Sequence, residues 1–90
     1  MAQAIVDPEV LRSFARSLRH FNAELEKLTG GLSHQLASLS ATWRDQEHRK
    51  FVEQFEQQMK SVGRLCEANE QYVPYLLRKA EHIEQYLQSR

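Results

Sequence analysis

Apolar residues recur every three or four positions through most of this chain, in two long runs separated by a short polar stretch. The first run follows Asp7-Pro8-Glu9, where an N-cap aspartate, a proline at the first helical position and an acid near the helix start favour helix initiation. Its apolar positions are Leu11, Phe14, Leu18, Phe21, Leu25, Leu28, Leu32, Leu36 and Leu39. Many of them lie seven residues apart, which is typical of a coiled-coil-like stripe. The pattern predicts a helix over about 8–41.

Gly30-Gly31 falls inside this first run and leaves two interpretations open. Two glycines in a helix interior cost about 2 kcal/mol relative to two alanines, so the pair could break the run and give three helices. The apolar phase nevertheless continues from Leu28 to Leu32, a single step of four residues. That continuity favours one helix, weakened in its middle, where the missing side chains let a neighbouring helix approach closely.

The second run has the same spacing and contains a proline. Its positions are Phe51, Phe55, Met59, Val62, Cys66, Asn69, Val73, Leu76, Ala80, Ile83 and Leu87. Pro74 removes one backbone hydrogen bond and crowds the preceding turn, but the apolar phase persists beyond it. The run therefore predicts a helix over about 46–88 with a kink near Pro74.

The stretch Thr42–Asp45 joins the two runs and contains the only tryptophan. Two registers of this bend are open. Asp45 as the N-cap of the second helix places the bend just before it, whereas a capping box of Thr42 and Asp45 places the bend at Ser40–Ala41. The first register is favoured because Glu47 then lies in the first helical turn. The prediction is an all-α antiparallel helix-turn-helix hairpin, with residues 1–90 as a single domain.

A lone hairpin of this kind has no third layer to cover its apolar stripes. Helices of this length extend about 50 and 65 Å at about 1.5 Å per residue. Further apolar residues flank the main stripes, namely Val10, Val52, Leu65, Tyr72, Leu77 and Tyr86. A small two-helix unit is marginal by itself, and pairing two hairpins into a four-helix bundle would cover both stripes. We therefore expect a dimer, with itself or with a similar chain.

Charge and composition narrow the classes of function. Twelve basic and twelve acidic residues cancel, which argues against a nucleic-acid partner. No apolar run approaches the roughly 20 residues of a membrane span. The first residues lack the basic and apolar regions of a secretory signal, and the single Cys66 fits a reducing compartment. We expect synthesis in the cytoplasm, with export of the folded protein by another route left open.

The sequence predicts no catalytic, cofactor-binding or metal residues. His20 and His34 are 14 residues apart, about 21 Å along one helix, which is too far to share an ion. Asp45, Glu47 and His48 cluster at the second helix start, where we interpret them as an N-cap, an acid matched to the helix dipole and a surface histidine.

Two other sets of residues have structural rather than chemical interpretations. Cys66 is in phase with the apolar run and is expected to be a small buried hydrophobe. A basic stripe on the first helix is expected to face acids of the second; it consists of Arg12, Arg16 and Arg19, opposite Glu67 and Glu70. Ion pairs between the helices, or simple solvation, account for such a stripe.

Trp43 between two long helices resembles the bend of the WXG proteins, small substrates of type VII secretion of about one hundred residues. The resemblance covers nearly the whole chain, with Phe51 and Phe55 where bulky residues follow the turn in that family. Asp45 stands where the family has glycine; aspartate tolerates a left-handed conformation and can cap the next helix. The resemblance implies a non-enzymatic protein that acts as a homodimer or heterodimer. Trp43 and Asp45 would form the turn and the apolar residues of both runs the seam.

The family's export signal is a tyrosine followed four positions later by an acid. Here Arg90 follows Tyr86 at that distance, so the signal is not present in this chain. Two hypotheses follow. In the first, the chain is a secreted substrate or is co-secreted with a partner. In the second, it is a cytoplasmic adaptor or chaperone-like partner of a larger helical protein or toxin.

Overall fold

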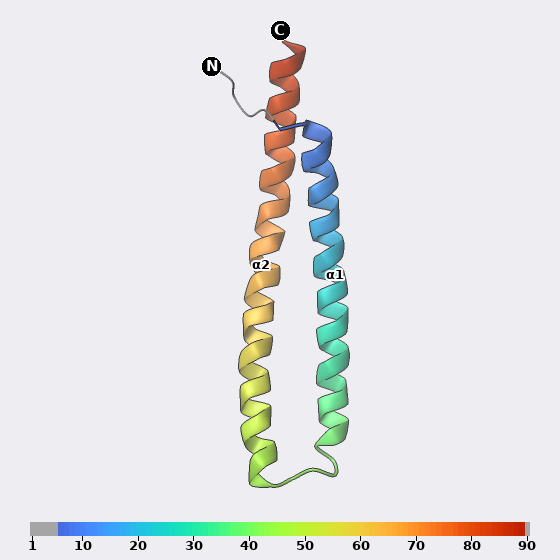
Figure 1. Ribbon diagram of the computed structural model, residues 1–90, viewed down its shortest axis with the longest axis vertical. Coiled ribbons are helices and arrows are strands. Elements are labelled where there is room, and N and C mark those ends of the chain that lie inside the picture. Colours follow the sequence, from blue (N-terminus) through green and yellow to red (C-terminus); the bar gives the residue numbers. More distant parts are fainter. Residues whose placement is uncertain (1–5, 90) are drawn as a thin grey trace.

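Two antiparallel helices make up the protein (Figure 1). The structure is a computed structural model, and it describes residues 6–89. Helix α1, Pro8–Leu39, and helix α2, Gln46–Gln88, are joined by a short bend and form a rod of 68 × 22 × 16 Å. The predicted all-α hairpin is confirmed, and α1 ends two residues before the predicted boundary at 41.

Both helices begin at an aspartate N-cap, as the sequence predicts. The Asp7 carboxylate accepts a hydrogen bond of 2.9 Å from the amide of Glu9, and the Asp45 carboxylate accepts one of 2.9 Å from the amide of His48. The Thr42 hydroxyl instead donates to the carbonyl oxygen of Leu39 at 3.4 Å. The register with Asp45 as N-cap is therefore confirmed, and the capping-box alternative is wrong.

Neither the glycine pair nor the proline interrupts its helix. Helix α1 continues through Gly30-Gly31, so the three-helix alternative is wrong. A Cβ built on either glycine would meet no atom within 4 Å, so α2 does not approach closely there, contrary to expectation. At this level the half-buried Thr29, rather than the glycines, lies toward the interior. Helix α2 continues through Pro74, and a kink at that residue stays a prediction.

The buried core consists of small side chains. Its apolar members are Ala15 of α1 and Cys66, Val73 and Ala80 of α2. Within residues 6–89 no large side chain is fully buried. Half-buried leucines of both helices flank this core. One hairpin therefore encloses only a thin apolar interior, and most of its large apolar side chains remain partly exposed.

A pair of buried asparagines bridges the helices near the middle of α1. The amide nitrogen of Asn22 donates to the carbonyl oxygen of Cys66 at 2.9 Å. The amide nitrogen of Asn69 donates to the side-chain oxygen of Asn22, also at 2.9 Å. If one helix shifted along the other, these buried amides would lose their hydrogen bonds at a cost in free energy. The asparagine pair therefore fixes the register of the two helices.

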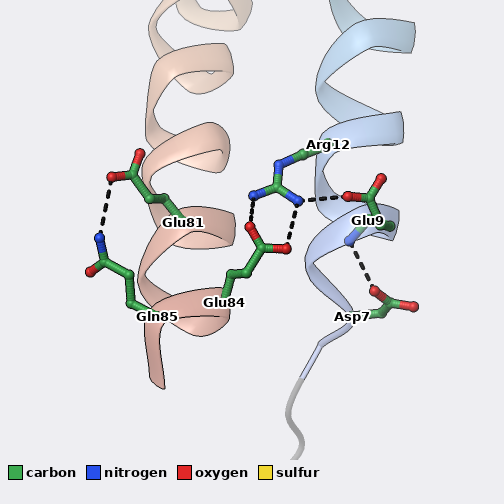
Figure 2. A network of polar contacts seen from close by, with 6 residues as sticks. All are labelled: Asp7, Glu9, Arg12, Glu81, Glu84 and Gln85. Carbon is green, nitrogen blue, oxygen red and sulfur yellow. Dashed lines mark hydrogen bonds and ion pairs between the residues drawn. The ribbon is translucent and has the colours of Figure 1, made fainter. Parts of the chain in front are cut away.

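An ion pair closes the open end of the hairpin (Figure 2). The guanidinium of Arg12 donates to both carboxylate oxygens of Glu84, at 2.7 and 3.3 Å, and to Glu9 at 2.6 Å. We expected Arg12 to face Glu67 and Glu70, and this expectation is wrong. Arg12 lies in the first turns of α1, which pack beside the last turns of α2 and hence beside Glu84.

Candidate functional site

The predicted seam residues separate into two groups in the hairpin. The first group is buried or half-buried: Leu11, Leu18, Leu25, Leu36, Phe55, Met59, Val62, Cys66, Val73, Leu76 and Ile83. The second group is exposed: Phe14, Phe21, Leu28, Leu32, Leu39, Phe51 and Leu87. The seam is therefore wider than the contact between the two helices. Whether the exposed group binds a partner stays a prediction.

Most of these exposed seam residues lie on one side of the hairpin, together with the flanking residues Leu65 and Tyr72. On α1, Phe14 immediately precedes the buried Ala15, and Phe21 precedes the buried Asn22. On α2, Leu65 and Tyr72 stand in the same relation to Cys66 and Val73. Because the helices are antiparallel, the same rotational offset from the core turns both stripes to one side.

We call this side the apolar face. It consists of Phe14, Phe21, Leu28, Leu32, Leu39, Phe51, Leu65 and Tyr72. These side chains are between 42% and 61% exposed, values unusual for so many large apolar groups on one face of a small protein. Such a face can bury a large apolar area against another protein.

Aromatic side chains organise the bend at one end of this face. Trp43 packs edge-on against His48 at a centroid distance of 5.0 Å and lies 5.9 Å from Phe51, which in turn lies 6.0 Å from Phe55. Asp45, the other predicted turn residue, is extended rather than left-handed, with φ −89°. Its role here is to cap α2, which does not require glycine.

His48 is a structural residue of the bend rather than the surface histidine that we expected. Its Nε2 atom lies 2.7 Å from the Ser40 hydroxyl, which also lies 2.9 Å from the Leu36 carbonyl oxygen. The Ser40–His48 pair therefore links the C-cap of α1 to the first turn of α2 with either imidazole tautomer. Sequence reasoning missed this pair because it joins the end of α1 to the start of α2 across the bend.

Two further structural residues were missed, Ala15 and Asn22, although both precede or follow predicted seam residues by three or four positions. The spacing alone contained a signal, because Asn22 lies four residues after Leu18 and three before Leu25. Asn69 belongs to the predicted second run, but its partner Asn22 interrupts the apolar pattern of the first run, where the adjacent Phe21 fits that pattern.

Cys66 is buried, as predicted, with 7% of its surface exposed. Burial raises the pKa of its thiol because it penalises the thiolate, and the negative charges of Glu26 and Glu70 raise that pKa further. A thiol of this kind stays protonated at neutral pH and is a poor nucleophile.

Residues 6–89 contain neither a cluster of metal ligands nor a helix suited to crossing a membrane. No three His, Cys, Asp or Glu side chains of this part lie together as metal ligands would. No helix in it has an apolar stretch of the length that crossing a bilayer requires. The feature that remains as a candidate site is the apolar face with its aromatic bend.

Comparison with known proteins identifies one family. Residues 3–88 match the model of the family described as proteins of 100 residues with WXG. The match includes the bend, although Asp45 replaces the glycine of the motif. Neither a curated protein nor a solved structure matches the chain.

Proposed function

Since this chain belongs to the WXG100 family, we propose that it is a non-enzymatic interaction module, a substrate or co-secreted partner of a type VII secretion system that acts as a dimer. The family is one of small helical proteins of the type VII secretion type. Residues 1–90 would act as one domain, and the partner would be a second copy or a similar chain.

The apolar face is the observation that supports this proposal. Its residues would be covered if two hairpins packed face to face as a four-helix bundle. The thin core also supports pairing of two hairpins. A single hairpin that buries only small side chains removes little apolar surface from water and is stabilised little by it.

Replacement of Phe21 by aspartate tests the pairing. Phe21 is 48% exposed in the hairpin, so Phe21→Asp leaves the core intact while placing a charge on the apolar face. We expect light scattering to show a dimer for the unmodified chain and a monomer for the variant, because burying an unpaired carboxylate is costly. Phe55→Asp should also abolish dimers, but Phe55 is half-buried and its loss also weakens the hairpin.

His20→Asp is the matched control. It introduces the same charge at the neighbouring exposed position of α1, outside the apolar face. This variant should keep the mass of the unmodified chain. A well-folded Phe21→Asp dimer would contradict the proposed pairing surface.

The second candidate function is that of a cytoplasmic adaptor or chaperone-like partner of a larger helical protein. The residue four positions after Tyr86 is Arg90, where the export signal has an acid, and this favours the adaptor. The two functions are separated by assaying the culture medium of cells with an intact or an inactivated secretion ATPase. ATPase-dependent appearance supports secretion, and retention in both strains supports the adaptor.

A further inference from the structure

Two helical glycines lie in open space on the side of the hairpin away from the apolar face. Gly30 of α1 and Gly63 of α2 both lie within helices, where glycine is among the least favourable residues. Neither has the positive φ that would require glycine. A Cβ at either position would meet no atom within 4 Å, so the hairpin itself gives no steric reason for a missing side chain.

Both glycines line one groove between the helices. This hollow of about 440 Å³ is lined by Gly30, Gly63, Met59 and Val62 among others. It shares Ser33 and Met59 with a hollow of about 750 Å³ toward the bend. It shares Glu26 and Glu70 with one of about 370 Å³ toward Arg19.

We call these three joined hollows the glycine groove. On the side of the first helix the groove runs from Arg19 of α1 to the C-cap Ser40, a length of about 31 Å at about 1.5 Å per residue. Ala23 and Glu67 line it and immediately follow the buried Asn22 and Cys66, whereas the residues of the apolar face precede core residues. The groove and the apolar face therefore lie on opposite sides of the hairpin.

The middle of the groove is acidic. Glu26, Glu67 and Glu70 line the hollow that contains the two glycines, and no basic side chain lines that hollow. None of the three carboxylates takes part in an ion pair with residues 6–89. Basic side chains, Lys60 and Arg19, line only the two flanking hollows.

We propose that the glycine groove binds an α-helix of another polypeptide, one that carries a narrow apolar ridge bordered by lysines or arginines. Glycine at the crossing point lets a third helix approach both backbones closely, which accounts for a residue type that the hairpin alone does not need. The bordering cations would pair with Glu26, Glu67 and Glu70. Because the groove is opposite the apolar face, this third helix can bind while the apolar face is covered.

A helical peptide of about 20 residues, matched to the groove length, serves as the probe. It carries an alanine and leucine ridge bordered by lysines, and a second peptide has glutamate in place of every lysine. Fluorescence anisotropy of the labelled peptides with the full chain should show binding of the lysine peptide only. Equal binding of both peptides, or none of either, overturns the proposal.

Two variants locate the binding site. Gly30→Leu combined with Gly63→Leu places side chains in the groove at two positions where an added Cβ meets no atom within 4 Å, and it should weaken binding of the lysine peptide at least about tenfold. Gly31→Leu is the matched control, because Gly31 is also helical and open but does not line the groove. It should bind as the unmodified chain does. Unchanged binding by the double variant overturns the proposal.

The mass of the double variant in solution separates a foreign helix from a second copy. Under the proposal, light scattering gives the same mass for the unmodified chain and the double variant. A lower mass for the variant means that a second copy of this chain covers the groove, which also overturns the proposal. Phe21→Asp, which tests the apolar face, should retain binding of the lysine peptide, so the two surfaces are judged separately.

Discussion

At the residue scale, the buried Asn22–Asn69 pair sets the alignment of the two helices. Leucines of similar spacing could pair in several registers, because each leucine accepts any apolar neighbour. The asparagines allow only one register, because a shift of the helices would leave each buried amide without its hydrogen-bonding partner. We therefore expect the pair to contribute more to the uniqueness of the fold than to the free energy of folding.

Asn22→Ala should lower the free energy of unfolding by about 1–3 kcal/mol, because it leaves the Asn69 amide and the Cys66 carbonyl without their partner. Urea unfolding followed by circular dichroism measures this loss. In the double variant Asn22→Leu/Asn69→Leu both polar groups are gone, and stability should return to or exceed that of the unmodified chain. Equal losses in the two variants would show that the hydrogen bonds are not the cause.

The Arg12–Glu84 ion pair predicts a dependence of stability on pH. The hydrogen bond from Arg12 and its positive charge lower the pKa of Glu84. A carboxylate whose pKa is lower in the folded state contributes stability above its unfolded pKa of about 4.3, and loses it as the pH falls through the folded pKa. Glu84→Gln should therefore lower the Tm by a few degrees at most at pH 7, because the pair is partly exposed.

The difference in Tm between the unmodified chain and Glu84→Gln should close on acidification. Thermal melts at neutral and strongly acidic pH provide the comparison. Glu81→Gln is the control, since Glu81 accepts a hydrogen bond from Gln85 of its own helix and points away from α1 (Figure 2). A Tm difference for Glu84→Gln that persisted at acidic pH would show that charge is not the basis of the effect.

At the element scale, helix α1 is continuous but contains two adjacent glycines. Gly31 is exposed, and a side chain added there would touch nothing. Gly31→Ala should therefore raise the free energy of unfolding by up to about 1 kcal/mol through helix propensity alone. Urea unfolding checks the gain. Lys27→Ala, an exchange of two good helix formers at an exposed position of the same helix, should change little.

The helices and the bend could be predicted from the sequence because their signals are local. Asp7 and Asp45 fix the helix starts by accepting hydrogen bonds from nearby backbone amides, and Pro8 favours the first start through its restricted φ. The division of the seam into core and apolar face could not be predicted. A spacing of three and four residues makes a stripe about 100° wide, and only the partner helix decides which edge of it is buried. Phe14 and Ala15 illustrate this, because the smaller residue is the buried one.

The Arg12–Glu84 and Ser40–His48 contacts escaped prediction for a related reason. Each joins a residue on one side of the bend to a residue on the other side, so their alignment depends on the exact length of the bend and on the asparagine register. Neither the length of the bend nor the register of the helices can be deduced from the spacing of residues within one helix. The candidate site was therefore foreseen as a set of residues, but its location on one side of the hairpin required the structure.

At the scale of the whole molecule, stability should depend on protein concentration. A thin core of small residues is joined to an exposed apolar face, so association would bury much of the available apolar area. We expect the Tm to rise when the concentration is raised about a hundredfold, because dimerisation stabilises the folded state by mass action. Calorimetry at the two concentrations measures the shift. Phe21→Asp should melt at one temperature at both, and a concentration-independent Tm of the unmodified chain would contradict a dimer.

The start of α1 and the end of α2 lie side by side at one end of the rod (Figure 1), and this has a mechanical consequence. A force that separates the two chain ends would peel the helices apart turn by turn instead of sliding them along each other. The Arg12–Glu84 ion pair would yield first, and the Asn22–Asn69 bridge would resist next. A motor that pulls on the C-terminal end would meet these barriers one at a time, and the aromatic bend would be the last part to open.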